Sequence, residues 1–188
     1  LYKRLFMNLF NYYKYYTWPN KIKLLNKINN IIDKKSTFDD EDLKADATKT
    51  SSVKFIEYHY LKNLLEEYIV NALSVNSDIF GYTIFPISPY QVLNINYYKN
   101  NEQYNWHTDA SRNPSKDIKL TLLLNISNNK YSGGEFEIFL SEKPEQIKTF
   151  TKGGDILLLK SSVLHRVKPV LKGIRKGLTI FLTGPRFI

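Results

Sequence analysis

The sequence predicts a β-rich core with helices on one outer face, an α+β arrangement. The first 76 residues contain two stretches in which apolar side chains recur at helical spacing. From Ser77 to the C-terminus, short runs rich in β-branched and aromatic residues follow one another, separated by glycines and other turn residues. Because a sheet must bury a face against another element, helices ahead of a series of short strands predict antiparallel sheets covered by those helices.

The two helices are expected over Lys21 to Asp33 and from Ile56 to Leu73. In the first, apolar residues recur at helical spacing, and Pro19 stands just ahead of the run, where proline favours a helix start. In the second, the four-residue spacing also places the apolar side chains on one face. The segment between them, Lys34 to Ser52, has few large apolar residues and no clear period, so it is expected to be a long loop.

Eight short strands are expected in the second part of the chain. They are YTIF (82–85), QVLNINYY (91–98), YNWHTD (104–109), KLTLLLNI (119–126), GEFEIFL (134–140), DILLLK (155–160), HRVKPV (165–170) and GLTIFLT (177–183). This number of strands within about 110 residues fits a double-stranded β-helix, the two-sheet jelly roll of cupin-like proteins. We therefore expect a single domain over residues 1–188, with an N-terminal helical support segment at 1–76 and the double-stranded β-helix core at 77–188.

The composition limits the kinds of site that the chain can form. Without cysteine there is no disulfide, no thiolate zinc site and no cysteine nucleophile, so a metal would need histidine or oxygen ligands. The net charge of +9 could attract nucleic acid. However, Lys, Asn, Ile and Tyr are frequent along the whole chain, which indicates an AT-rich genome rather than a basic binding face. Nucleic acid is therefore not the expected partner.

The sequence also bears on the compartment. No segment approaches the roughly 20 apolar residues that a membrane-spanning helix needs, so no membrane association is expected. The lack of cysteine fits a reducing compartment, which favours the cytoplasm. Because the chain begins at Leu1 rather than at a Met, a processed piece that has lost a targeting segment is a further expectation.

Two of the three histidines form a candidate metal site together with one aspartate. His107 and Asp109 are two residues apart, so on an extended strand both side chains point to the same side. His165, on a later strand, is the candidate for the third ligand. Two imidazoles and one carboxylate on one side of an ion are the ligand set of non-heme Fe(II) oxygenases, which keep the opposite positions open. His59, on the second expected helix, is interpreted as a structural or surface residue.

Arg175 provides an independent test of this hypothesis. If 2-oxoglutarate binds iron through its 1-carboxylate and 2-oxo group, its 5-carboxylate ends inside the barrel and needs a buried cationic partner. Arg175 lies ten residues after His165, at the start of an expected strand, and strand alternation places it on the same face as Thr179. The hydroxyl of Thr179, or that of Thr121 on a neighbouring strand, is a candidate to lie near the same carboxylate.

Five ordered elements of the chain have the composition and spacing of a known family. They are Tyr98 to Asp109, Tyr131 to Phe136, Gly154 to Leu159, His165 to Val170, and Gly173 to Arg175 followed by Leu178. With these elements the chain resembles, from about Ser52 to Pro185, the prolyl 4-hydroxylase-like branch of the 2-oxoglutarate and Fe(II) dependent dioxygenases. Residues 1–51 add little beyond a helix of the kind that such proteins place on the sheet.

The resemblance implies an enzyme that hydroxylates prolyl residues of a peptide or protein and releases succinate and CO2. Its cofactors would be Fe(II), O2 and 2-oxoglutarate, optionally with ascorbate. His107, Asp109 and His165 would hold the iron, Arg175 the 5-carboxylate, and Tyr98 would hydrogen-bond 2-oxoglutarate. Collagen-type members have Lys where this chain has Arg175, so the resemblance points to the oxygen-sensor, bacterial or viral subgroups and to the cytoplasm of a bacterial cell or a virus-infected host.

The substrate is less well defined by the sequence. Tyr104, Trp106 and Phe181 are expected to border it, and Arg112, in the polar loop after the His-Asp pair, is expected to close over it. Phe181 stands where many members of the family have Trp, and the turn at 99–102 lacks the usual Gly, so the resemblance does not determine the substrate. The sequence does not determine the oligomeric state either. The alternatives are hydroxylation of a free amino acid or other small molecule, demethylation of nucleic acid, and a cupin-like binding module without catalysis.

Overall fold

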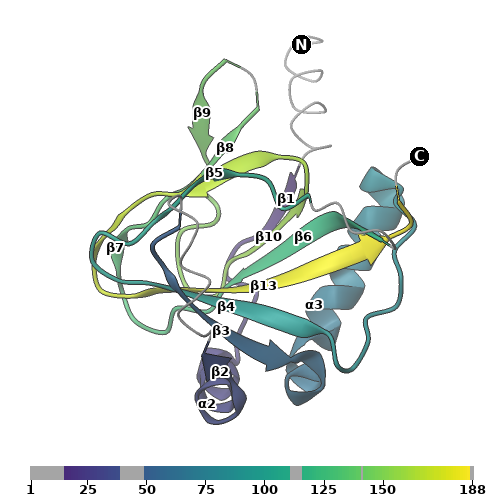
Figure 1. The fold of residues 1–188 in the computed structure, drawn as a ribbon, viewed down its shortest axis with the longest axis horizontal. Coiled ribbons are helices and arrows are strands. Elements are labelled where there is room, and N and C mark those ends of the chain that lie inside the picture. The colour runs from purple at the N-terminus through teal and green to yellow at the C-terminus, as the bar shows by residue number, and fades with distance from the viewer. Residues whose placement is uncertain (1–14, 39–48, 111–115, 141, 187–188) are drawn as a thin grey trace.

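The computed structural model describes residues 15–38, 49–110, 116–140 and 142–186, which form two main antiparallel sheets (Figure 1). Within these residues the larger sheet has seven strands. In spatial order they are β1 (Tyr15–Trp18), β10 (Ile156–Lys160), β6 (Asp117–Asn125), β13 (Arg175–Gly184), β4 (Val92–Tyr98), β3 (Ser52–Glu57) and β2 (Thr37–Phe38). The smaller sheet contains β5 (Tyr104–His107), β11 (Leu164–Val167), β8 (Phe136–Phe139) and β9 (Pro144–Gln146), while β12 (Val170–Lys172) pairs with β7 (Ser132–Gly133). The predicted double-stranded β-helix is confirmed.

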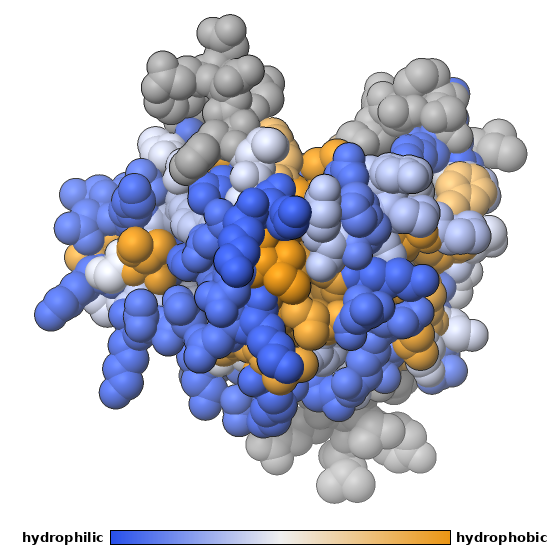
Figure 2. All heavy atoms as spheres, turned by 90° about the horizontal axis from the view of Figure 1, so that it is seen from below, coloured by the Kyte–Doolittle hydropathy of each residue, from blue (hydrophilic) through white to orange (hydrophobic). Residues whose placement is uncertain are grey.

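Helices cover the outer face of the larger sheet, as predicted. They are α2 (Leu25–Lys35) and α3 (Lys62–Val75), with the short turns η2 (Tyr58–Tyr60) and η3 (Asn76–Phe80) on either side of α3. The face on which α2 lies is mostly hydrophilic, with hydrophobic side chains visible as a band between polar ones (Figure 2). In the described ranges, no helix combines the length and the apolar character that a membrane span requires.

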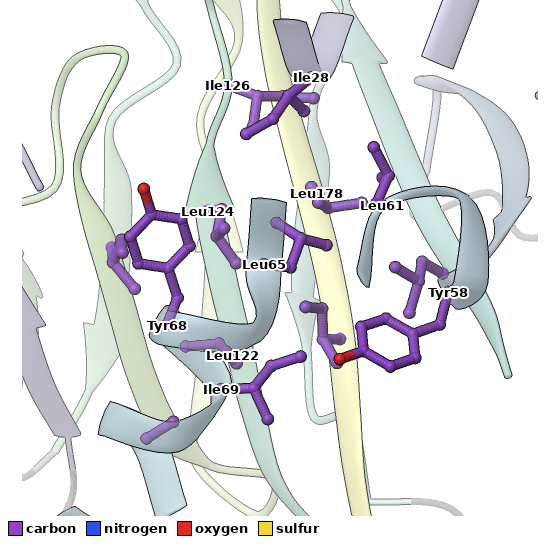
Figure 3. Close-up of a cluster of buried hydrophobic side chains, with 14 of the residues drawn as sticks. Ile28, Tyr58, Leu61, Leu65, Tyr68, Ile69, Leu122, Leu124, Ile126 and Leu178 are labelled. Atoms are coloured by element: carbon purple, nitrogen blue, oxygen red, sulfur yellow. The ribbon is translucent and has the colours of Figure 1, made fainter. Parts of the chain in front are cut away.

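One part of the core joins α3 to the larger sheet. Leu65 and Ile69 of α3 pack with Leu122 and Leu124 of β6 and with Leu178 of β13 (Figure 3). All five side chains are buried, and burying each leucine or isoleucine stabilises the fold by about 1.5–3 kcal/mol. Because β6 and β13 are central strands, this contact fixes the backbone from which the inward-facing side chains of the site project.

The central strands are buried on both faces. In β10, Ile156 and Leu158 point to the helices, whereas Leu157 and Leu159 belong to a second apolar cluster between the sheets. Alternate side chains of a strand point to opposite faces, so a strand between two apolar layers needs a continuous apolar run. This explains the sequence DILLLK at 155–160.

Both helices begin later than the sequence predicts. The N–H of Ile22 donates a hydrogen bond to the carbonyl oxygen of Gly154 (3.0 Å), which ties the residues before α2 to the loop before β10. The predicted start of the second helix at Ile56 is wrong, because Ile56 lies in β3 and pairs with Leu93 of β4. Residues four apart share a face on a strand as well as on a helix, so the spacing could not distinguish the two.

Seven of the eight expected strand segments contain a strand, and YTIF does not. That segment instead runs beside the end of β13, where the N–H of Phe85 donates a hydrogen bond to the carbonyl oxygen of Thr183 (2.8 Å). The segment HRVKPV divides into β11 and β12, with Pro169, which has no N–H, between them. Among the described residues, β1, β2 and β3 come from the part of the chain for which no strand was predicted.

Candidate active site

His107, Asp109 and His165 converge at one end of the smaller sheet. His107 is the last residue of β5 and lies directly opposite His165 on β11. Asp109 follows β5, and its N–H donates a hydrogen bond to the carbonyl oxygen of Ser161 (2.9 Å). One ligand atom from each of the three residues lies within 4.8 Å of the other two. The structure therefore brings together the three side chains that the sequence predicted as a metal site.

Backbone carbonyl groups fix the orientation of both imidazoles. The Nδ1 atom of His107 lies 2.7 Å from the carbonyl oxygen of Asn105, and that of His165 lies 2.9 Å from the carbonyl oxygen of Val163. Because a carbonyl oxygen can only accept, each Nδ1 carries the proton and each Nε2 keeps a lone pair. The two Nε2 atoms lie 3.7 and 3.6 Å from the carboxylate oxygens of Asp109, which is too far for hydrogen bonds. This arrangement fits a divalent cation.

The surroundings keep His107 neutral. Burial, followed by the neighbouring His165, lowers the pKa of the His107 imidazole to about 4. A neutral imidazole is the form that binds a metal, so Nε2 is available near neutral pH. Tyr104 stacks on the ring of His107 with 3.4 Å between centroids, and Phe136 stacks on the ring of His165 at 5.2 Å. Both rings are thus held by packing as well as by hydrogen bonds.

Thr121 holds the carboxylate of the candidate site. Its hydroxyl donates a hydrogen bond to Oδ2 of Asp109 (2.8 Å), and its side chain is fully buried on β6. The sequence pointed to Thr121 as a candidate neighbour of the cosubstrate carboxylate, whereas the structure places it on Asp109. A hydrogen bond of this kind restricts the rotation of a metal-binding carboxylate and tunes its affinity.

Thr121→Val is expected to weaken metal affinity by about 10-fold, because it removes this hydrogen bond while keeping the shape of the side chain. Titration with Mn²⁺, which resists oxidation, measures the affinity directly. Thr121→Ser keeps the hydroxyl and serves as the matched control. Equal Mn²⁺ affinity in the Val and Ser variants would show that the orientation of Asp109 does not depend on Thr121.

Arg175 lines the same cavity, which has a volume of about 100 Å³. It begins β13, opposite Tyr98 of β4, and only 3% of its surface is exposed. Among the described residues, no carboxylate pairs with its guanidinium, and its Nε has no hydrogen-bond partner. The guanidinium lies over the rings of Tyr98 and Phe150, 5.4 and 5.6 Å from their centroids. A buried cation without a carboxylate partner is still energetically costly, so this position fits the carboxylate of a ligand. The 5-carboxylate of 2-oxoglutarate is a group of this kind.

Two hydroxyl groups line the cavity together with Arg175. Burial raises the pKa of Tyr98 to about 12, so its hydroxyl stays protonated and can donate to a carboxylate. The oxygen of Thr179 accepts a hydrogen bond from the side-chain nitrogen of Asn96 (3.3 Å), which leaves the O–H of Thr179 as a donor. The structure thus places Tyr98 and Thr179 where the sequence expected them, in the cavity that Arg175 lines.

Some side chains that line the cavity were not predicted from the sequence. Among them are Lys49, Asn94, Asn96 and Phe150. The two asparagines alternate with buried apolar residues in β4 and share the face of Tyr98, so strand alternation could have identified them. Lys49 and Phe150 lie outside the regular strands, and Lys49 reaches the site through an isolated bridge to β5. No local pattern in the sequence signals such a contact.

Only some of the residues that were expected to border the substrate line the cavity. Tyr104 and Phe181 line the cavity, and Trp106 does not. Trp106 instead contacts the ring of Phe139 edge-on, with 5.9 Å between centroids. Arg112, which was expected to close over the substrate, lies outside the described residues.

A β-bulge in β5 explains the position of Tyr104. Tyr104 pairs with Val167 and His107 pairs with His165, so β5 has one residue more than β11 between these two pairs. As a result, Tyr104 and His107 stack on the same side of the sheet although they are three residues apart. Strict alternation would have put Tyr104 and His107 on opposite faces, whereas Trp106, directly before His107, points away from the cavity without any bulge.

Comparison with known proteins agrees with this geometry. The family model of the 2OG-Fe(II) oxygenase superfamily matches residues 93–183. A PKHD-type hydroxylase of Aliarcobacter butzleri is 33% identical over 163 residues, which are 81% of this chain and 66% of that protein. One from Xylella fastidiosa strain M23 is 31% identical over 129 residues, which are 61% of this chain and 53% of that protein. The chain therefore spans about one half to two thirds of the length of these two relatives.

Solved structures share the fold. A prolyl-4-hydroxylase of Pseudomonas putida has a TM-score of 0.68 at 15% identity, with 93% of this chain and 94% of that chain covered. A prolyl hydroxylase of Trichoplax adhaerens, in complex with a peptide fragment of hypoxia inducible factor, has a TM-score of 0.67 at 16% identity, with 93% and 86% covered. The fold and the site together fit an iron-dependent oxygenase with a double-stranded β-helix. The chain is similar to the 2OG-Fe(II) oxygenase superfamily over residues 93–183 and to PKHD-type hydroxylases, and the donor set of its site fits Fe(II) with 2-oxoglutarate.

Proposed function

We propose that this chain is a dioxygenase that hydroxylates prolyl residues of a peptide or protein, with succinate and CO2 as coproducts. The observation that carries the proposal is that His107, Asp109 and His165 meet in one cavity with Arg175, which has no carboxylate partner within the part of the chain that the structure describes. The prolyl substrate is supported by the PKHD-type hydroxylases that the chain matches in sequence and by the prolyl hydroxylases that share its fold.

Each side chain of the cavity has a separate task in this proposal. The residues that hold the metal are His107, Asp109 and His165. When bound, Fe(II) supplies the activation of O2 that hydroxylation of an unreactive C–H bond needs. Arg175 pairs with the 5-carboxylate of 2-oxoglutarate, and the hydroxyl groups of Tyr98 and Thr179 donate hydrogen bonds to the same molecule. The protein thus fixes the cosubstrate at the end that does not react.

The walls on the substrate side are aromatic. Tyr104 and Phe181 line the cavity and are both half-buried, so their rings can contact a substrate without a change in the core. Rigid aromatic rings supply a large apolar contact with little loss of side-chain freedom, which suits the ring of a prolyl residue. Both residues therefore position the substrate in this proposal.

Incubation of the chain with Fe(II), 2-oxoglutarate and a panel of proline-rich peptides tests the proposal. We expect succinate to form and one peptide to gain the mass of one oxygen atom on proline. Asp109→Ala, which lacks the carboxylate ligand, is the negative control. If succinate forms but no peptide is oxidised, the prolyl substrate is wrong and the dioxygenase activity is still supported. If no succinate forms under any condition, both parts of the proposal are wrong.

A second candidate is the hydroxylation of a free amino acid or other small polar molecule. The polar side chains of Lys49, Asn94 and Asn96 on the cavity wall favour it. The side-chain oxygen of Asn96 is buried, and no described residue gives it a hydrogen bond. The same assay with free amino acids in place of peptides separates the two candidates, because only one class of compound should stimulate succinate release.

A further inference from the structure

A second hollow, of about 510 Å³, adjoins the cavity. Phe181 lines both, so the two hollows share one wall. The side chains that define this aromatic groove are Phe85, Tyr90, Val92, Phe181 and Thr183. We propose that the aromatic groove binds an extended, proline-containing segment of the peptide substrate next to the residue that is hydroxylated. This inference rests on the proposed function and names the surface that would select the peptide.

The fold opens the aromatic groove where two strands separate. β13 pairs with β4 from Arg175, opposite Tyr98, to Thr179, opposite Asn94, and beyond Thr179 only β6 still pairs with it. The segment between α3 and β4 covers the open edge of β13 (Figure 1). There the side chain of Gln91 donates a hydrogen bond to the carbonyl oxygen of Phe181 (2.9 Å). The edge groups of β13 that a peptide strand would use are thus partly occupied, which favours recognition through side chains.

One face of β13 connects the cosubstrate to the aromatic groove. Arg175, Thr179 and Phe181 are separated by even numbers of residues, so they share a face, and all three line the cavity. Arg175 and Phe181 are six residues apart, which is about 20 Å along a strand. A peptide lying in the groove would therefore approach the metal site from the side opposite to the carboxylate-binding end.

The surface of the aromatic groove fits a proline-containing peptide. Tyr90 is 72% exposed, Val92 51% and Phe85 40%, which is unusual for large apolar side chains that lie so close together. Grooves lined by aromatic rings bind proline-rich segments, because such segments are already extended and lose little entropy on binding. The ring of Tyr90 is in edge contact with His59 (5.9 Å between centroids), which supports its position.

Charge adds a preference to this shape. Lys116 is the one charged side chain among the described residues that line the aromatic groove. A cation at the edge of an apolar surface attracts an acidic partner and disfavours a basic one. We therefore expect proline-rich peptides with an acidic residue to bind more tightly than those with lysine or arginine at the same position.

Binding of a fluorescein-labelled oligoproline of roughly ten residues, followed by anisotropy, tests this inference without turnover. Tyr90→Ala and Phe85→Ala are each expected to weaken binding by about 10-fold relative to the unmodified chain, as expected for aromatic anchors. Leu171→Ala is the matched control, because Leu171 is 67% exposed on β12 and lines neither hollow. Its affinity should equal that of the unmodified chain.

Two outcomes would overturn the inference, namely an unmodified chain that does not bind the peptide and variants that bind as tightly as the unmodified chain. Succinate formation with Fe(II) and 2-oxoglutarate, measured on the same preparations, separates this failure from that of the proposed function. If succinate forms but the groove variants bind the oligoproline as tightly as the unmodified chain, the proposed dioxygenase activity is still supported and the peptide binds at another surface. Because Tyr90 is mostly exposed, its replacement should leave the thermal unfolding midpoint unchanged.

Discussion

Arg175→Met is expected to lower kcat/KM for 2-oxoglutarate by roughly 100-fold or more. Removing one partner of a buried, hydrogen-bonded ion pair costs about 2–5 kcal/mol, which corresponds to a factor of about 30 to several thousand in affinity. The loss should appear mainly as a higher KM for 2-oxoglutarate, because the methionine cannot pair with the 5-carboxylate. Succinate release measured over a range of 2-oxoglutarate concentrations gives the value.

The same variant should not lose stability when 2-oxoglutarate is absent. In the free protein, Arg175 is a buried cation without a carboxylate partner among the described residues, and an apolar side chain of similar volume relieves that cost. We therefore expect an equal or higher thermal unfolding midpoint for Arg175→Met. Arg175→Lys keeps the charge but not the planar fork, so it should bind 2-oxoglutarate with intermediate affinity. A Met variant with an unchanged KM would show that the cosubstrate does not contact this side chain.

Local sequence patterns were sufficient to predict the metal site. The spacing of His107 and Asp109 is a property of three consecutive residues, although contacts with Ser161 and Thr121 fix the final position of Asp109. His165 could be added because, with three histidines in the sequence and His59 on an expected helix, few combinations were open. His59 in fact lies in η2, partly exposed and 3.1 Å from Glu57, away from the cavity.

Features that depend on pairing between distant strands could not be predicted. The bulge that brings Tyr104 onto the same face as His107 exists only because β5 pairs with β11 in this register. Likewise, Ile56 joins β3 because β4 offers it a partner, although its spacing fits a helix equally well. Thr121 was identified as a hydroxyl near the site, but its contact with Asp109 follows from the way β6 faces the end of β5. In each case tertiary pairing decided between alternatives that the local sequence allowed.

The aromatic groove also could not be predicted from local sequence patterns. Phe181 was expected to border the substrate because of its position six residues after Arg175. Phe85 and Tyr90 lie in a segment whose first part was predicted to be a strand, and such a prediction does not indicate which side chains share a surface with Phe181. The separation of β4 from β13 creates that surface, and it is a property of the sheet rather than of either strand.

His107→Ala is expected to abolish succinate formation and to lower the affinity for Mn²⁺ by roughly 100-fold or more, because two protein ligands cannot hold the ion as three do. The third histidine of the chain supplies the matched control. His59→Ala removes the same side chain from a partly exposed position outside the cavity, and it should bind Mn²⁺ and form succinate as the unmodified chain does.

Thermal unfolding provides a readout of the same site that needs no turnover. A ligand that binds only the folded state stabilises it by about 2.7 kcal/mol at a concentration of 100 times its Kd. Saturating Mn²⁺ should therefore raise the unfolding midpoint of the unmodified chain and of His59→Ala, but not that of His107→Ala. If Mn²⁺ raised the midpoint of all three proteins equally, the ion would be bound elsewhere, and the geometry of His107, Asp109 and His165 would need another explanation.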